Sequence, residues 1–262
     1  MDFFYGTWGG NMIKLFVFIS LFFVLNSFCQ EHKFLPDNDL WKEDSLYGDR
    51  SYDRQKMFND IIDAGQALYN PVAQQNDETL TIKKLWDDPT VNASTQRLWG
   101  VTIKMYGGLA RREEINPEGF ALVLCHELGH AYGGIPYISA YNELSAEGQS
   151  DYYSAGVCAK ELLKKLEFEQ SLSTITQYML TSCGSRYSGE MYSICVRTLN
   201  GGQSLGNLLA VIKKEAIPNY ETPDTTVVST TALSYPKKVQ CRLDTYFRGA
   251  LNLPRPACWF KN

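Results

Sequence analysis

Two histidines and a glutamate lie within five residues of this chain. His126 and His130 are four residues apart, and Glu127 directly follows the first histidine. In a helix, residues four apart project from one face a single turn apart, so both imidazoles can bind one metal ion. Zinc accepts such ligands, and the carboxylate of Glu127 can then take a proton from a zinc-bound water. The spacing therefore predicts one site that holds both a nucleophile, the zinc-bound water, and the base that activates it, Glu127.

Independent signals place this stretch on a helix. Asn116 and Pro117 form an N-cap followed by a proline at the first helical position, and an apolar run leads from Phe120 into the histidine pair. The whole chain has three histidines, and two of them stand in this pattern. A helix with incidental histidines is therefore the weaker interpretation.

A catalytic zinc site needs a third protein ligand. No histidine follows His130, so a carboxylate must complete the site. Glu147 and Asp151 are four residues apart in the stretch EGQSD and would share one helix face. Glu143 is the competing ligand, but the acidic residue four positions after it is Glu147 itself. On these grounds alone, both Glu143 and Glu147 remain candidates for the third ligand.

These residues together resemble a known group of enzymes. An HExxH helix followed by a second helix with ExxxD is similar to the gluzincin metallopeptidases, and EGQSD resembles both the thermolysin-type E-G-x-S-D pattern and the ExxxD of peptidase family M48. The resemblance covers residues 116–166. It implies an α+β, zincin-like domain with a small sheet, Glu147 as third zinc ligand, and Asp151 as the carboxylate that orients His126.

A looser resemblance concerns the C-terminal part. Family M48 often carries a His-Pro pair followed by Arg, and this chain has Tyr235-Pro236 and then Arg242. The resemblance implies that Tyr235 donates to a developing oxyanion and that Arg242 supports it or the substrate. A turn proline and an ordinary arginine are the alternative. Gluzincin geometry also implies that the strand ending at Tyr106 is an edge that binds an extended peptide.

Hydrophobic periodicity predicts the elements around the site. A helix is expected from the N-cap Asp53 to Asn70-Pro71, because apolar residues recur there at helical spacing. Alternation predicts a strand over 97–106. Its expected buried face consists of Trp99, Val101, Ile103 and Met105. The threonine-rich stretch 222–231 is predicted to be a loop, and His32 a solvated histidine.

Six of the seven cysteines lie after residue 30, and no CxxC pair occurs. An even number is consistent with disulfides in an oxidising compartment, although six cysteines allow 15 pairings and buried free thiols are the alternative. Nearness in sequence favours two pairs and leaves a third by elimination. The expected disulfides are Cys183–Cys195, Cys241–Cys258 and Cys125–Cys158.

The beginning of the chain is typical of an export signal. Lys14 precedes an apolar run, Leu15 to Leu25, which is too short to span a bilayer comfortably. We expect residues 1–29 to be a signal peptide, with Met12 as an alternative start, and residues 30–262 to form one exported domain. A periplasmic or secreted protein without a stable membrane span follows from this prediction.

The charge composition excludes one class of partner. The net charge is −4 and acidic and basic residues are interspersed, which argues against nucleic acid as a partner. The histidine motif together with the resemblance implies a zinc-dependent endopeptidase with Zn²⁺ as cofactor and a protein or peptide as substrate. The alternative is an inactive zinc-binding envelope protein. Glu127 favours the enzyme, because a purely structural zinc site does not need that carboxylate.

Overall fold

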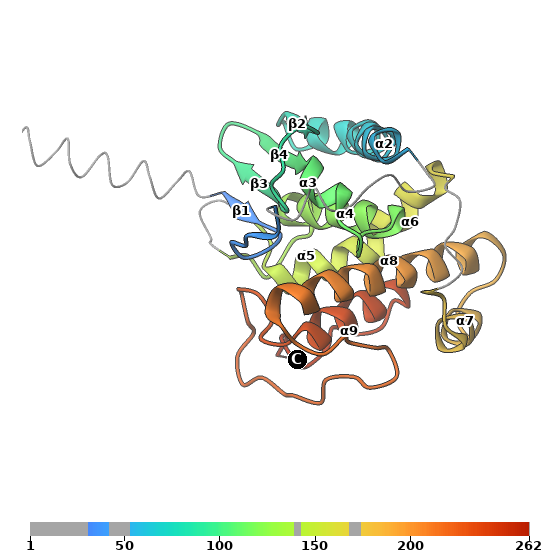
Figure 1. Ribbon diagram of the computed structural model, residues 1–262. Helices are drawn as coiled ribbons and strands as arrows, with labels where there is room; N and C mark the ends of the chain where they lie inside the picture. Colours follow the sequence, from blue (N-terminus) through green and yellow to red (C-terminus); the bar gives the residue numbers. More distant parts are fainter. Residues whose placement is uncertain (1–30, 42–52, 139–142, 168–173, 262) are drawn as a thin grey trace, which may run out of the picture.

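The computed structural model describes residues 31–41, 53–138, 143–167 and 174–261 (Figure 1). The predicted signal peptide lies outside these residues. The strands are β1 (His32–Lys33), β2 (Leu80–Leu85), β3 (Ala93–Arg97) and β4 (Val101–Tyr106). The α-helices are α2 (Arg54–Gln75), α3 (Gly107–Arg111), α4 (Pro117–Tyr132), α5 (Glu147–Tyr153), α6 (Ala159–Leu162), α7 (Gln177–Gly184), α8 (Gly189–Lys213) and α9 (Val239–Ala250). A π-helical turn, η2 (Ser154–Cys158), joins α5 to α6, and a 3-10 turn, η3 (Leu163–Lys165), follows α6.

The four strands form one mixed sheet in the order β1-β3-β4-β2. β4 pairs with β2 in parallel and with β3 antiparallel, and β1 pairs antiparallel with the other side of β3. The predicted α+β class with a small sheet is confirmed. The expectation that the strand ending at Tyr106 is a free edge is wrong, because β4 has a hydrogen-bonded neighbour on each side.

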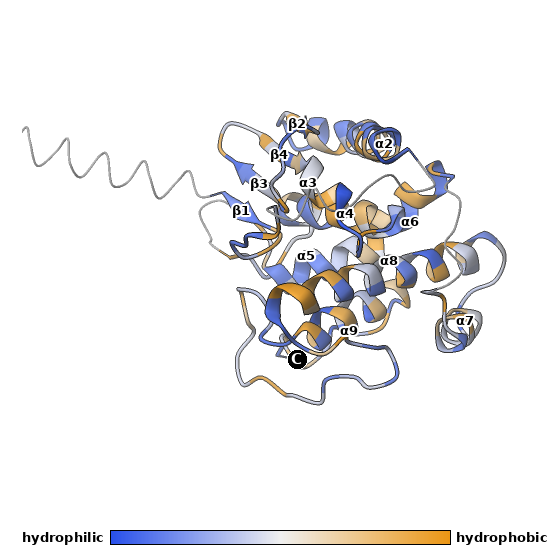
Figure 2. Ribbon diagram, viewed as in Figure 1, coloured by the Kyte–Doolittle hydropathy of each residue, from blue (hydrophilic) through white to orange (hydrophobic). Residues whose placement is uncertain are grey.

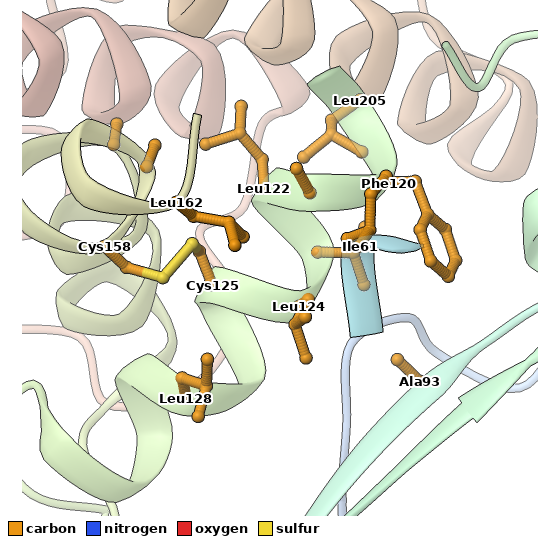
Figure 3. Close-up of a cluster of buried hydrophobic side chains, with 14 of the residues drawn as sticks. Ile61, Ala93, Phe120, Leu122, Leu124, Cys125, Leu128, Cys158, Leu162 and Leu205 are labelled. Carbon is orange, nitrogen blue, oxygen red and sulfur yellow. A yellow bond between two sulfur atoms is a disulfide. The ribbon is translucent and has the colours of Figure 1, made fainter. Parts of the chain in front are cut away.

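Helix α4 is the centre of the core. It contacts α2, α5, α8, β3 and β4, and all its residues from Pro117 to Ala131 are buried. Figure 2 shows how hydrophobic much of α4 is, whereas α2 also carries hydrophilic residues toward solvent. Figure 3 shows Leu122, Leu124 and Leu128 of α4 among side chains from neighbouring elements. The helix that carries the histidines is therefore fixed on every side by packing.

All three expected disulfides form: Cys125–Cys158, Cys183–Cys195 and Cys241–Cys258. The first joins α4 to the turn η2 (Figure 3). Disulfides are consistent with an oxidising compartment. Among the described residues, no helix is long and apolar enough to cross a membrane.

Two predicted elements have different bounds. The first helix continues through Pro71 to Gln75, because Ala73 is buried in the core and Asn76 caps the last turn through its backbone and side chain. A proline removes one hydrogen bond from a helix, but packing of the following turn can outweigh that loss. The helix predicted to begin at Asn116 starts there as expected, with Asn116 as N-cap.

The predicted strand over 97–106 is interrupted by a turn. Leu98 to Gly100 connect β3 to β4, and Trp99 is 92% exposed, so its expected place on the buried face is wrong. Val101, Ile103 and Met105 are buried as predicted. The stretch 222–231 contains no helix or strand, as expected of a loop.

Candidate metal centre

Local signals fix the histidine helix at its N-terminus. The side chain of Asn116 accepts a hydrogen bond from the Gly119 N–H at 2.7 Å, and Pro117 occupies the first turn, where its missing donor costs nothing. From this start the helix runs through His126 and His130, whose ring centroids are 4.6 Å apart. Both imidazoles lie on one side of α4, as their spacing predicts.

Glu147 comes to the two histidines from the first residue of α5. Its Oε2 lies 3.3 Å from His126 Nε2, and its Oε1 lies 3.6 Å from His130 Nε2. All three side chains are buried, and their ligand atoms lie within 4.8 Å of one another. The structure thus brings together the three residues that were predicted as metal ligands.

The inward-facing atoms of this group fit a bound cation. His126 Nε2, His130 Nε2 and Glu147 Oε2 are buried without a hydrogen-bond partner, which is uncommon for polar atoms inside a protein. Ligands about 2.0–2.1 Å from a tetrahedral metal are separated from each other by roughly 3.3 Å, close to the distances found here. A metal ion would satisfy all three atoms at once.

The other ring nitrogens are held by protein partners. Nδ1 of His126 lies 2.8 Å from Asp151 Oδ1, and Nδ1 of His130 lies 2.8 Å from the Ser145 carbonyl. The Ser150 hydroxyl is 3.0 Å from the same His130 nitrogen. A proton on each Nδ1 leaves the Nε2 lone pair free for a cation, which is the usual arrangement of metal-binding histidines.

Asp151 is itself held by residues of α9. Arg242 donates from Nε to Asp151 Oδ2 and from Nη2 to Oδ1, both at 2.7 Å, and the Tyr246 hydroxyl donates to Oδ1 at 2.6 Å. Burial by itself would raise the pKa of Asp151, but Arg242 and His126 outweigh it and hold that pKa well below its usual range. Asp151 is therefore the ionised partner of His126.

Arg242 is a buried member of this network. Its side chain is 1% exposed and bonds Asp151, so it positions that carboxylate, and its guanidinium carbon lies 5.8 Å from the centre of the Tyr235 ring. Tyr246, which sequence reasoning missed, belongs to the same network. Its position four residues after Arg242 on α9 was the available signal.

The surroundings of the two histidines shift their pKa values in opposite directions. Burial tends to lower the pKa of His126, but Asp151 and Glu147 raise it to about 9. Burial lowers the pKa of His130 to about 4, and Glu147 and the hydrogen bond to the Ser145 carbonyl oppose that shift only in part. In the metal-free protein at neutral pH, His126 therefore carries a proton that a cation must displace.

Glu127 lies beside the three ligand residues but is not one of them. Its Oε2 accepts a hydrogen bond from the Thr95 hydroxyl of β3 at 2.5 Å, and its Oε1 is buried without a partner. Burial raises the pKa of Glu127 to about 8, with Glu147 adding to the shift while His126 and Thr95 oppose it. Such a carboxylate is suited to accept and return a proton near neutral pH. Sequence reasoning missed Thr95.

The competing ligand lies apart from the three candidate ligands, whereas the expected oxyanion donor lines a cavity beside one of them. Glu143 is exposed, and it is not part of the buried ligand group. Tyr235 is half-buried and donates its hydroxyl proton to the Lys33 carbonyl. Tyr235 and Glu147 line the same cavity of about 560 Å³. The cavity leads to one ligand of the candidate centre.

His32 was predicted to be solvated, but the structure places it at the site. Its ring centroid is 5.6 Å from that of His130, and the residue is half-buried. Phe34, two residues on, meets the ring of His126 edge-on with centroids 5.0 Å apart. The polar sequence around His32 gave no signal of this position, because it depends on strand pairing with β3.

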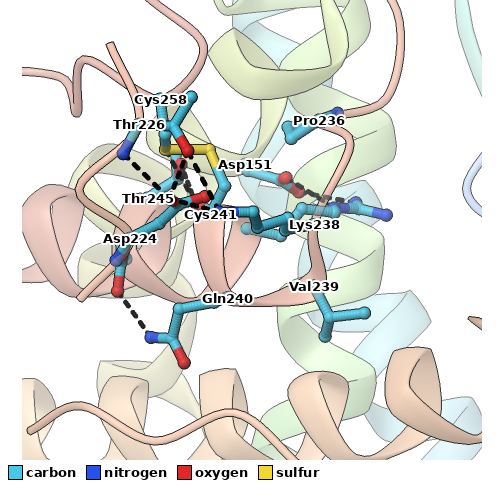
Figure 4. Close-up of a disulfide and its surroundings, with 12 residues drawn as sticks. Asp151, Asp224, Thr226, Pro236, Lys238, Val239, Gln240, Cys241, Thr245 and Cys258 are labelled. Atoms are coloured by element: carbon cyan, nitrogen blue, oxygen red, sulfur yellow. Dashed lines mark hydrogen bonds and ion pairs between the residues drawn. A yellow bond between two sulfur atoms is a disulfide. The ribbon is translucent and has the colours of Figure 1, made fainter. Parts of the chain in front are cut away.

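A second group of potential ligands does not form a metal site. Asp224 lies near Cys241 and Cys258, but these sulfur atoms are joined in a disulfide and offer no thiolate (Figure 4). Asp224 instead pairs with Lys238 at 3.0 Å and accepts from Thr226. The disulfide ties the C-terminal segment to α9.

None of the family models, curated proteins or solved structures compared with this chain matches it.

Proposed function

We propose that this chain is a zinc-dependent peptide hydrolase of the gluzincin type, similar to peptidase family M48. The observation that carries the proposal is the convergence of three unpartnered ligand atoms, from His126, His130 and Glu147, beside a buried carboxylate that is not a ligand. The bond from His126 to Asp151 on the second helix also agrees with the gluzincin pattern. We propose that residues 30–262 form one such domain and that it is exported, to the periplasm or beyond.

The donor set favours zinc. Two imidazoles and one carboxylate are characteristic of catalytic zinc sites with three protein ligands, whereas calcium and magnesium prefer sites made of oxygen atoms. A zinc ion bound there would lower the pKa of a coordinated water and polarise a substrate carbonyl.

The chain's own residues would handle the proton. Oε1 of Glu127 is free to accept it from water, while Thr95 holds Oε2 and thereby fixes the orientation of the carboxylate. The same carboxylate would then deliver the proton to the leaving amine of the peptide. Tyr235 could donate to the developing oxyanion only after its hydroxyl leaves the Lys33 carbonyl.

One observation favours a second candidate, an inactive zinc-binding protein. His126, Glu127 and His130 are each 0% exposed, and the rings of His32 and Phe34 pack against the two histidines. A site that never opens would bind metal without turnover. The unpartnered Oε1 of Glu127 favours the enzyme, since a structural site has no use for a buried carboxylate that binds no metal.

Metal content and peptide hydrolysis test the proposal together. Wild-type protein should hold one zinc and cleave a quenched-fluorescent peptide. Glu127→Gln should keep the zinc and lose about 10²–10⁴-fold in turnover, the usual contribution of a general base. Glu147→Ala should lose the zinc, whereas Glu143→Gln should behave as wild type. A zinc-loaded wild type that cleaves nothing, with Glu127→Gln indistinguishable from it, would favour the inactive protein.

A further inference from the structure

The first strand occupies the open side of β3. Without β1, β3 would be an edge strand with free backbone groups, a place where extended peptides add to a sheet. His32 is opposite Thr95 and Lys33 is opposite Ser94 in an antiparallel register. Thr95 is also the residue that holds Glu127, so β1 lies directly beside the candidate catalytic group.

The same segment covers the ligands. The ring of His32 faces His130, and the ring of Phe34 faces His126. Glu147, the third ligand, is 3% exposed. His32, Lys33 and Glu147 all line the cavity of about 560 Å³. A peptide that reaches the ligands along β3 must therefore take the place of this segment.

The segment is firmly anchored at one end. Phe34 and Leu35 are 0% exposed, and Asn92 bonds both the N–H and the carbonyl of Leu35 at 3.0 Å. Arg242 also donates from Nη1 to the Phe34 carbonyl at 3.3 Å. These contacts fix the chain just after β1 to the core.

Contacts before this anchor are nearer the surface. Lys33 is exposed and forms an ion pair with Asp37. Both side chains of this pair face solvent, and exposed ion pairs contribute little to stability. Glu31 is half-buried and forms an ion pair with Lys104 at 3.0 Å. Residues 31–33, whose His32 covers His130, are therefore held by more exposed contacts than Phe34 and Leu35.

We propose that residues 31–33 are an occluding strap, which takes the strand position of a peptide substrate on β3 and keeps the metal centre latent until it is released. The inference rests on the proposed peptidase function for its physiological meaning. The covering of the metal ligands does not depend on that function. Release would expose the β3 edge, free the Tyr235 hydroxyl from Lys33, and open the cavity toward Glu147.

The directions of the backbone N–H groups allow one variant that weakens the pairing of β1 with β3 and a matched control that does not. The Phe34 N–H donates to the Ala93 carbonyl at 2.9 Å, and alternate residues of a strand face the same neighbour. The backbone N–H of His32 thus faces β3, while that of Lys33 faces away. Proline has no N–H, so His32→Pro should weaken the pairing, and Lys33→Pro should leave it intact.

Both variants would be made in the full chain and loaded with one zinc ion per molecule. Two rates would then be measured for each variant and for the wild type. The first is the rate at which a chelator removes zinc, and the second is peptide hydrolysis. His32→Pro should raise the zinc-removal rate about tenfold, as expected for losing one backbone hydrogen bond and the ring cover, and should raise turnover. Lys33→Pro should match wild type in both, with unchanged circular dichroism in all three proteins.

The outcomes separate the strap from the peptidase function. Faster zinc removal in His32→Pro alone supports the strap even if no protein cleaves any peptide, in which case the proposed function fails. Peptide cleavage at equal rates in all three proteins, with equal zinc removal, would keep the function and overturn the strap. A gain in turnover cannot come from partial unfolding, which would lower it.

Discussion

Each histidine of the candidate centre is held by a partner on the far side of its ring, and the two partners differ in charge. His126 faces the ionised carboxylate of Asp151, whereas His130 faces the neutral Ser145 carbonyl. This difference explains why the pKa of His126 is raised and that of His130 is lowered. The two ligands therefore respond differently to pH.

Zinc affinity should rise with pH because of His126. Below its raised pKa of about 9, the metal-free protein carries a proton on His126 that zinc must displace, and above that pKa the ring is already neutral. One displaced proton predicts an increase in affinity of about tenfold from pH 7 to 8 and about fivefold from pH 8 to 9, where the ring of His126 is already partly neutral. Competition with a chelator of known affinity at pH 7, 8 and 9 measures this slope. Equal affinities over that range would show that His126 is not protonated in the metal-free site.

The buried pair of Arg242 and Asp151 should matter for both stability and metal binding. Arg242→Met removes the partner of a fully buried carboxylate and should lower the free energy of unfolding by about 3–5 kcal/mol. It should also weaken zinc binding, because Asp151 would orient His126 less firmly. Urea unfolding and zinc titration measure the two effects.

A second buried pair provides the control for that variant. Arg197 contacts Glu118 at 3.1 Å and bonds the Leu163 carbonyl, and neither side chain is part of the metal site. Arg197→Met should cost comparable stability but leave the zinc affinity of the folded protein unchanged. Equal loss of zinc affinity in both variants would mean that the effect at Arg242 is only a loss of stability.

At the scale of elements, the distance between α4 and α5 sets the position of Glu147. A Cβ placed on Gly129 would lie 2.9 Å from the Ser150 carbonyl oxygen and 3.0 Å from the Ser150 Cα, too close for an unperturbed contact. The absence of a side chain there lets the two helices approach closely. The geometry of the three candidate ligands thus depends on a residue outside that group.

Gly129→Ala should therefore weaken zinc binding while the chain remains folded. The added methyl group must push α5 away from α4 and increase the distance from Glu147 to the histidines. Gly184→Ala is the control, because its Cβ would meet Tyr192 at an ordinary 3.6 Å. Isothermal titration with zinc compares the variants. Wild-type affinity in Gly129→Ala would show that the helix spacing tolerates the methyl group.

Elements with local signals could be predicted from the sequence, and those that depend on partners could not. Asn116 and Pro117 mark the start of α4, and the spacing of His126 and His130 fixes their common face. By contrast, β3 buries Ala93, Ser94 and Thr95 in succession, small or polar residues without alternation. Nothing local identifies such a strand, so Thr95 was missed together with it.

The positions of Arg242 and His32 show the same limit at the site itself. A motif indicated that Arg242 matters, but only the packing of α9 against α5 shows that it bonds Asp151. His32 reaches the site because β1 pairs with β3, a contact between residues far apart in sequence. Tertiary contacts of this kind leave little trace in local sequence.

At the scale of the whole molecule, three disulfides stabilise a chain that already has an extensive core. Cys125 is adjacent to the ligand His126, and its bond to Cys158 closes a separation of 33 residues. The Cys183–Cys195 bond closes a separation of 12 residues, far along the chain from the ligands. Chain-entropy arguments give about 4 kcal/mol for the longer loop and about 3 kcal/mol for the shorter one.

Replacing both cysteines of a pair by alanine should reveal this difference. The Cys125→Ala, Cys158→Ala double variant should have the lower thermal midpoint and weaker zinc binding, because the bond ties the histidine helix to the turn after α5. The Cys183→Ala, Cys195→Ala double variant should lose stability while its folded form keeps its zinc affinity. Calorimetry with zinc titration measures both, and the reverse order would contradict the assignment.

The most direct test of the central claim is the titration of metal-depleted protein with zinc while peptide hydrolysis is followed. Three ligand residues beside one base predict that turnover rises with added zinc and saturates at one equivalent, and that Glu127→Gln binds the same equivalent without turnover. Zinc binding with no hydrolysis, or hydrolysis that persists in Glu127→Gln, would contradict a peptidase site built on His126, His130 and Glu147.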